Sequence, residues 1–128
     1  MSEVAGLFVY GTLRYPEVLR ALLGRVPDLS PASAKGWRVR ALPGVVYPGL
    51  VPDPARTAEG LLMTGLTDAE RHLIDVYEGD LYDTVTLTLE DGRRAHAYTW
   101  RGETEAFDWD PRHFAAHELA AYLSALRS

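Results

Sequence analysis

The sequence predicts an α+β protein built on a small curled sheet or barrel. Five or six short segments have the composition of strands, two of them form an antiparallel hairpin, and only two or three segments have helical periodicity. The helical segments do not alternate one-for-one with the strands, and no Gly-x-Gly-x-x-Gly motif follows the first strand. A doubly wound parallel sheet is therefore not expected.

The chain fits one domain, residues 1–128. Single hydrophobic cores commonly span roughly 100–150 residues, and no repeat, low-complexity segment or linker divides this sequence. The 47% hydrophobic and 24% charged residues are typical of a globular protein. No apolar run approaches the roughly 20 residues of a membrane span. Because cysteine is absent and the N-terminus lacks the features of a signal peptide, we expect a cytoplasmic protein.

The charge pattern limits the classes of partner. The formal net charge is −5, and the 13 basic residues are scattered along the chain. Nucleic acids are bound by continuous basic surfaces that follow the phosphates. We therefore expect no nucleic-acid partner and no membrane association, and the pattern leaves the oligomeric state open.

The first two elements are a strand and a helix. The apolar segment Leu7–Tyr10 predicts a buried strand. Pro16 then takes the first position of a helix that stops at Gly24. The apolar residues between them repeat at helical spacing: Val18, Leu19, Leu22 and Leu23.

The segment from Pro27 to Pro54 is rich in proline. It holds six of the eight prolines, so we expect irregular chain with turns. Lys35–Leu42 and Val45–Gly49 are strand-like islands within it. We expect Asp28–Asp53 to shape the rim of a cavity.

The second half of the chain has clearer signals. Glu59–Thr64 predicts a strand, and Thr67 with Glu70 forms a capping-box pattern before a helix from Asp68 to about Tyr77. Residues 84–89 alternate threonine with apolar side chains, and residues 95–100 alternate again, which predicts a hairpin. Its turn, Asp91-Gly92, is typical of type I′.

A closing amphipathic helix is expected after Asp110-Pro111. The aspartate is a suitable N-cap, and the proline suits the first turn. One apolar stripe follows, made of Ala115, Leu119, Tyr122, Leu123 and Leu126.

The loop Gly11–Arg14 is the first candidate site. It joins a buried strand directly to a helix start, so its backbone N–H groups are free to hold a carboxylate or phosphate. We expect Gly11 to take a positive φ or to allow close approach of a ligand. The alternative is a plain turn with a strain-relieving glycine.

Glu78 is the second candidate. It lies in the last helical turn before Gly79, where the helix dipole disfavours a carboxylate. Tyr77 and Tyr82 are near in sequence, so Glu78 at the rim of an apolar cavity would have a raised pKa and act as a general base. The alternative is a solvated surface glutamate.

Other chemistries have little support. His113 and His117 have the spacing of metal ligands but lack a third ligand, so a solvated helix face is the favoured interpretation and no metal is expected. No cysteine is present and no serine lies in a nucleophile elbow, so covalent catalysis is not expected. The later aromatic residues are expected to pack the hairpin and the closing helix: Tyr98, Trp100, Phe107 and Trp109.

Three ordered segments carry a family resemblance: Val9–Arg14, Leu73–Tyr82 and Ala97–Trp100. Together they resemble the gamma-glutamylcyclotransferase-like family, in particular its AIG2-like branch, over roughly the first hundred residues. The resemblance implies a small mixed β-barrel with flanking helices and a cavity at one end. It also implies cyclisation of a γ-glutamyl amide to 5-oxoproline, with release of an amine or amino acid and without a cofactor.

The resemblance also assigns site residues. It implies that Glu78 is the catalytic general acid and base. One departure is present, because family members often carry an arginine two residues after the tyrosine that matches Tyr82, whereas this chain has Thr84. The substrate-binding residues that the resemblance implies are Tyr10, Gly11, Thr12, Leu13, Arg14 and Tyr82.

Two further functions stay open at this stage. A small-molecule or partner-binding domain can use the same barrel without turnover, since a fold does not fix a function. A γ-glutamyl hydrolase or acyltransferase can use the same carboxylate. The sequence does not identify the leaving group.

Overall fold

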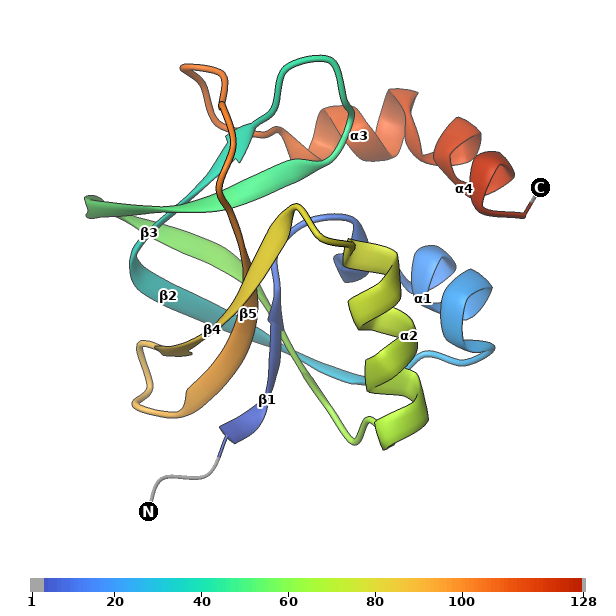
Figure 1. Ribbon diagram of the computed structural model, residues 1–128, viewed down its shortest axis with the longest axis horizontal. Coiled ribbons are helices and arrows are strands. Elements are labelled where there is room, and N and C mark those ends of the chain that lie inside the picture. Colours follow the sequence, from blue (N-terminus) through green and yellow to red (C-terminus); the bar gives the residue numbers. More distant parts are fainter. Residues whose placement is uncertain (1–3, 128) are drawn as a thin grey trace.

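The computed structural model describes residues 4–127 (Figure 1). Residues 1–3, on which part of the signal-peptide expectation rests, lie outside the described residues. The elements follow in the order β1 (Val4–Val9), η1 (Thr12–Arg14), α1 (Pro16–Leu23), β2 (Asp28–Ala41), β3 (Pro48–Thr64), α2 (Asp68–Glu78), β4 (Tyr82–Thr88), β5 (Arg94–Trp100), α3 (Pro111–His117) and α4 (Leu119–Arg127).

The five strands form one curled sheet, which confirms the α+β class. Their order is β2-β3-β1-β5-β4, and β1 pairs in parallel with β5 while the other described pairs are antiparallel. The barrel is not closed, because no ladder joins β2 to β4 among the described residues. The two edges still meet, since the Glu90 N–H donates to the Ser33 carbonyl at 2.9 Å.

The expectation of irregular chain between Pro27 and Pro54 is wrong. The described residues there form β2 and the first part of β3, which pair from Asp28 opposite Thr64 to Ala41 opposite Pro48. Proline is tolerated because β2 is an edge strand, and the register shift beyond Lys35 leaves part of β3 unpaired. The predicted strand Glu59–Thr64 lies within β3, and Lys35–Leu42 lies within β2 except for Leu42, whereas Val45 to Tyr47 remain a loop.

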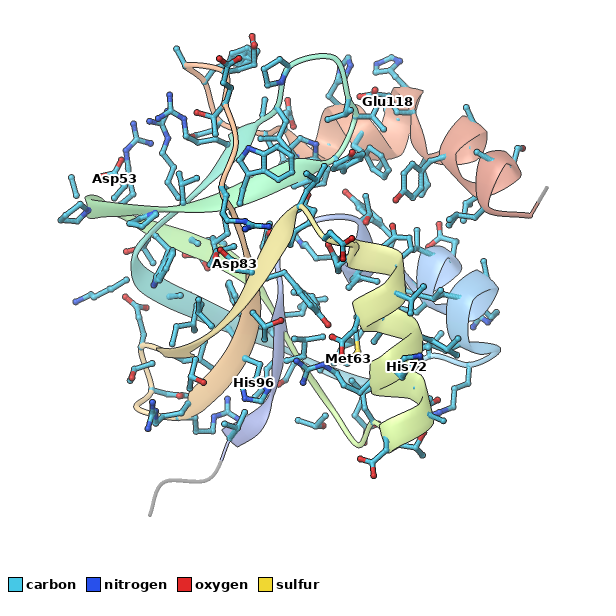
Figure 2. The ribbon with its side chains drawn as sticks, in the orientation of Figure 1. Asp53, Met63, His72, Asp83, His96 and Glu118 are labelled. Carbon is cyan, nitrogen blue, oxygen red and sulfur yellow. The ribbon has the colours of Figure 1, made fainter. Side chains whose placement is uncertain are left out.

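Alternation along β1 places two apolar clusters on opposite faces of the sheet. Leu7 and Val9 pack with Met63 of β3 and Ile74 of α2, on the face that carries the helices (Figures 1 and 2). Phe8 belongs to a second cluster inside the curl. The chain therefore buries both faces of its central strand.

The helix ends agree with the predicted caps. Gly24 ends α1 in a left-handed conformation, with φ +80°. The Thr67 hydroxyl accepts from the Glu70 N–H at 3.1 Å, and the Glu70 carboxylate accepts from the Thr67 N–H at 3.0 Å. Asp110 caps α3 by accepting from the N–H groups of the next turn.

The closing helix is broken, contrary to expectation. α3 ends at His117 and α4 begins at Leu119, with Glu118 between them outside helical geometry at φ −127°. Ala115 is exposed and does not join the apolar stripe, whereas Leu119 is buried. The periodicity continues across the break, which is why the sequence suggested one helix.

The turn of the hairpin also differs from the prediction. A type I′ turn needs positive φ at both central residues, but no described residue other than glycine has positive φ. The turn instead spans Leu89 to Gly92, with the Gly92 N–H donating to the Leu89 carbonyl at 2.9 Å and Gly92 at φ +91°. The predicted alternation is confirmed, since Val85 lies opposite Ala97 in the ladder.

Gly60 allows β3 to lie close to β1. A Cβ at this position would lie 2.4 Å from the Val9 carbonyl oxygen and 3.0 Å from the Phe8 ring. We expect Gly60→Ala to lower the free energy of unfolding by about 1–3 kcal/mol, because the strand backbone must move. Chemical denaturation measures this loss. Thr57→Ala, at an exposed position of the same strand, is the control, and equal effects of the two changes would contradict the packing argument.

Candidate active site

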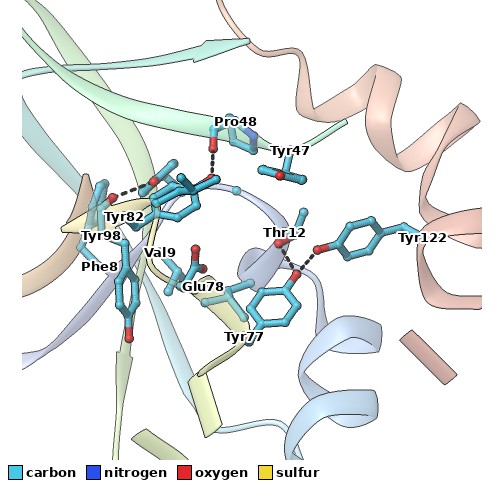
Figure 3. Close-up of a pocket in the computed structure, with 14 residues that line it drawn as sticks. Phe8, Val9, Thr12, Tyr47, Pro48, Tyr77, Glu78, Tyr82, Tyr98 and Tyr122 are labelled. Carbon is cyan, nitrogen blue, oxygen red and sulfur yellow. Dashed lines mark hydrogen bonds between the residues drawn. The ribbon is translucent and has the colours of Figure 1, made fainter. Parts of the chain in front are cut away.

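A pocket of about 150 Å³ lies where β1 ends (Figure 3). It is bounded by the loop after β1, the loop before β3, the end of α2, the start of β4 and one side chain of α4. Six of the seven tyrosines of the chain line it. These are Tyr10, Tyr47, Tyr77, Tyr82, Tyr98 and Tyr122.

The fold brings most of the predicted site residues together. Residues 10–13, Glu78 and Tyr82 all line this pocket. Arg14 does not, because it lines a separate cavity with Arg38 and Arg56. The predicted roles of these residues remain predictions.

The loop after β1 turns sharply into η1. The N–H groups of Arg14 and Tyr15 donate to the carbonyls of Gly11 and Thr12, at 3.0 and 3.3 Å. The N–H groups of Thr12 and Leu13 have no acceptor within the part of the chain that the structure describes. They are therefore available to an anion in the pocket.

Gly11 has a steric role. Its φ is −119°, so the expectation of a positive φ is wrong. A Cβ here would lie 2.8 Å from Cγ and 2.9 Å from Cδ of Pro48, which lines the pocket on the other side. The glycine thus lets two walls of the pocket approach each other.

Glu78 is the last residue of α2, and Gly79 follows it at φ +78°. Its side chain is partly accessible through the pocket, and it forms no hydrogen bond or ion pair with any described residue. Burial among apolar and aromatic groups, followed by the negative charge of Asp75, raises its pKa from 4.5 to about 8. The interpretation as a solvated surface glutamate does not fit this environment.

Asp75 lies one turn earlier on the same helix, and two side chains contact its carboxylate. It accepts from the Tyr98 hydroxyl and pairs with Arg71 at 3.2 Å. Burial acts to raise its pKa, but the hydrogen bonds from Tyr98 and Arg71 outweigh it and hold the pKa below the ordinary value. Asp75 therefore stays ionised where Glu78 keeps its proton.

Most of the hydroxyl groups of the pocket form hydrogen bonds with one another or with the backbone (Figure 3). The Tyr82 hydroxyl donates to the Pro48 carbonyl at 2.8 Å, and the Tyr10 hydroxyl donates to the Tyr98 carbonyl at 2.7 Å. Sequence reasoning did not assign Tyr98 or Tyr122 to the site. Both were expected to pack the core, because apolar periodicity cannot distinguish a core face from a pocket wall.

The family model described as gamma-glutamyl cyclotransferase, AIG2-like, matches residues 7–116. The chain belongs to this family. AIG2-like protein C from Arabidopsis thaliana is 33% identical over 129 residues, which cover 94% of this chain and 75% of that protein. A protein from Methanocaldococcus jannaschii, named gamma-glutamylcyclotransferase and putative RNase, is 29% identical over 98 residues, covering 73% of this chain and 44% of its own length.

Solved structures share the fold of this chain. A solution structure of an Arabidopsis thaliana protein has a TM-score of 0.71 at 25% identity, covering 93% of this chain and 85% of that one. A structure named gamma-glutamyl cyclotransferase has a TM-score of 0.59 at 11% identity, covering 95% and 85%, and therefore shows the shared fold alone. Within the described residues, no helix is both long and apolar enough to cross a membrane.

Other candidates from the sequence lie away from the pocket of this AIG2-like chain. His113 and His117 are exposed on α3, with ring centroids 4.7 Å apart. Phe107 is 54% exposed, so its expected packing role is wrong, whereas Trp109 does pack on Phe114. Thr84 stands where the family often has an arginine. Its neighbour Asp83 forms an ion pair with Arg101 at 3.3 Å.

The raised pKa of Glu78 predicts that this residue destabilises the fold at alkaline pH. The unfolded chain loses the proton near pH 4.5 and the folded chain near pH 8, so stability falls as the pH rises through this window. Glutamine stays neutral. We expect Glu78→Gln to be more stable than wild type above pH 8, by on the order of 1 kcal/mol or more, with the difference vanishing near pH 4.

Thermal unfolding from pH 4 to pH 9 measures this difference. Glu90→Gln, at an exposed position of the hairpin turn, is the control and should change little at any pH. An effect of Glu78→Gln that does not change with pH would show that folding does not raise the pKa of Glu78.

The contact between Gly11 and Pro48 predicts a coupled pair of mutations. Gly11→Ala places a methyl group against the proline ring, so we expect a loss of about 1–3 kcal/mol in the free energy of unfolding. Pro48→Ala removes the ring atoms that clash. The double variant should therefore be more stable than the sum of the single losses, as urea unfolding of the four proteins measures, and simple additivity contradicts the contact.

Proposed function

We propose that this chain is a γ-glutamylcyclotransferase that converts a γ-glutamyl amide into 5-oxoproline and releases an amine. The observation that carries the proposal is the position of Glu78, a carboxyl group without a described partner in a pocket that Thr12 and Leu13 also line, and the N–H groups of these two residues have no described acceptor. Membership of the cyclotransferase family supports the same class of reaction.

The substrate contains its own nucleophile. The loop N–H groups bind the α-carboxylate, which leaves the glutamyl chain folded with its α-amine near the γ-carbonyl. A reactant held in this way gains an effective molarity on the order of 10⁵ M or more. The chemistry therefore needs positioning and proton transfer, and no cofactor enters the proposal.

Glu78 is the proton carrier in this proposal. The α-amine nitrogen attacks the γ-carbonyl carbon, a new C–N bond closes the five-membered lactam, and the bond from that carbon to the leaving nitrogen breaks. The carboxylate takes one proton from the α-amine and delivers it to the leaving nitrogen, so Glu78 ends unchanged. Because its pKa is about 8, the ionised fraction and the rate should rise as the pH increases through 8.

The pocket lining favours an amine as the leaving group. Among the described lining residues, no lysine, arginine or histidine is present, and Glu78 is the one carboxyl group. A second substrate carboxylate would lose water without gaining a counter-charge. Aromatic rings such as those of Tyr47 and Tyr122 accept a neutral or cationic amine more readily.

The test follows 5-oxoproline by mass spectrometry. Wild type, Glu78→Gln and the control Glu90→Gln are incubated with γ-glutamyl amines and γ-glutamyl amino acids. We expect wild type and the control to form 5-oxoproline, faster from the amines, and Glu78→Gln to be slower by roughly 10²–10⁴-fold. Equal turnover by Glu78→Gln overturns the assigned role.

The same assay separates the alternative functions. Glutamate in place of 5-oxoproline indicates a hydrolase. Stabilisation by a γ-glutamyl compound without any product indicates a binding domain.

A further inference from the structure

Three hydroxyl groups form a chain along one wall of the pocket (Figure 3). Thr12 Oγ1 lies 2.7 Å from the Tyr77 hydroxyl, which in turn bonds to the Tyr122 hydroxyl. The three residues come from η1, α2 and α4, and all three line the pocket. The chain of hydroxyls therefore connects the loop after β1 to the C-terminal helix.

The three hydroxyl groups together carry one hydrogen that the bonds between them do not use. Three hydroxyls carry three hydrogens, and the two bonds between them use two. Tyr82, Tyr10 and Tyr98 differ, because each gives its single hydrogen to a carbonyl or to Asp75. Within the described part of the protein, the third hydrogen of the chain has no acceptor, so it is available to a ligand.

Tyr122 is held in place from outside the site. Its ring packs edge-on against Phe114, with centroids 5.6 Å apart and planes at 71°. It lies in α4, after the break at Glu118 and beyond the residues 7–116 that the family model matches. α4 thus supplies a pocket group that the matched segment of the family does not contain.

We infer that Tyr122 is a positioning residue for the substrate carboxylate, acting through Tyr77 on Thr12. When Tyr122 donates to Tyr77, the Tyr77 hydrogen is directed to Thr12, and the Thr12 hydrogen is left for the ligand. The Thr12 side chain and the free N–H groups of Thr12 and Leu13 then meet the same carboxylate. The inference rests on the proposed function for the identity of that ligand.

The alternative orientation of the hydroxyls explains why Tyr122 matters. Without the Tyr122 hydroxyl, the Tyr77 oxygen no longer accepts a hydrogen from Tyr122. It can then accept the Thr12 hydrogen, which is withdrawn from the pocket. One hydrogen bond contributes about 0.5–1.5 kcal/mol, so the expected loss of ligand affinity is roughly 2–12-fold. The amine, the γ-carbonyl and Glu78 are not touched, so kcat should change less than KM.

The experiment compares wild type, Tyr122→Phe, Thr12→Val, the double variant and the control Tyr15→Phe. Tyr15 also loses a hydroxyl bond, to the Pro111 carbonyl at 2.8 Å, and also packs on Phe114, but it does not line the pocket. We expect KM to rise in Tyr122→Phe and in Thr12→Val, and the double variant to lose no more than Thr12→Val alone. Tyr15→Phe should keep the wild-type KM.

Each outcome has a separate meaning. Additive effects, or equal KM values in Tyr122→Phe and Tyr15→Phe, overturn the role of Tyr122 and leave the proposed function standing. If wild type forms no 5-oxoproline, the proposed function fails, and calorimetric binding of 5-oxoproline to the same five proteins decides the role of Tyr122. Equal affinities of the five proteins for 5-oxoproline, or no binding, then overturn the role of Tyr122. Weaker binding by Tyr122→Phe that does not add to the effect of Thr12→Val supports that role. Thermal unfolding identifies any variant that has lost its fold, and the remaining member of the pair then carries the comparison with Tyr15→Phe.

Discussion

The position of β1 between β3 and β5 is the constraint on which the rest of the structure depends. A parallel neighbour on one side and an antiparallel neighbour on the other fix both edges of this strand. Its side chains are buried on both faces, so β1 cannot slide by one residue without exposing an apolar set. The loop that follows β1 therefore has a fixed position, at the end of the curled sheet where the pocket lies.

The end of α2 meets that loop because the helix packs on the same face of the sheet. Ile74 joins the cluster that contains Val9 and Leu13, and this contact sets the rotation of the helix about its axis. Tyr77 and Glu78 then face the pocket at the point where the helix stops. Packing of the core thus determines where the carboxyl group of Glu78 lies.

The sequence was sufficient for the elements whose signals are local. The capping box at Thr67, the left-handed stop at Gly24 and the alternation in the hairpin each depend on neighbouring residues, and all three are confirmed. The loop after β1 was identified because a strand that runs directly into a helix start leaves backbone N–H groups free, and Glu78 because a carboxylate at a helix end contradicts the ordinary preference.

The long strands β2 and β3 could not be predicted for a physical reason. Proline removes a hydrogen-bond donor, and this loss matters only where a neighbouring strand needs that donor. Whether Pro31 lies on an edge is a property of the whole sheet and cannot be read from residues beside it. The role of Tyr122 could not be predicted for a similar reason, since a tyrosine on an apolar stripe is consistent with a core or with a pocket wall.

Asp75 and Glu78 lie one helical turn apart, and their environments shift their pKa values in opposite directions. Asp75 has a guanidinium and a hydroxyl as partners, and its pKa is lowered, whereas Glu78 has no partner among the described residues and its pKa rises to about 8. The charge of Asp75 contributes to that rise, so the partnered residue helps to keep the unpartnered one protonated. Pairs whose environments separate their pKa values in this way are typical of acid and base chemistry. An unpaired buried carboxyl group costs folding free energy. A carboxyl group with a pKa of about 8 can take up and give back a proton near neutral pH, and the proposed reaction requires both steps of Glu78.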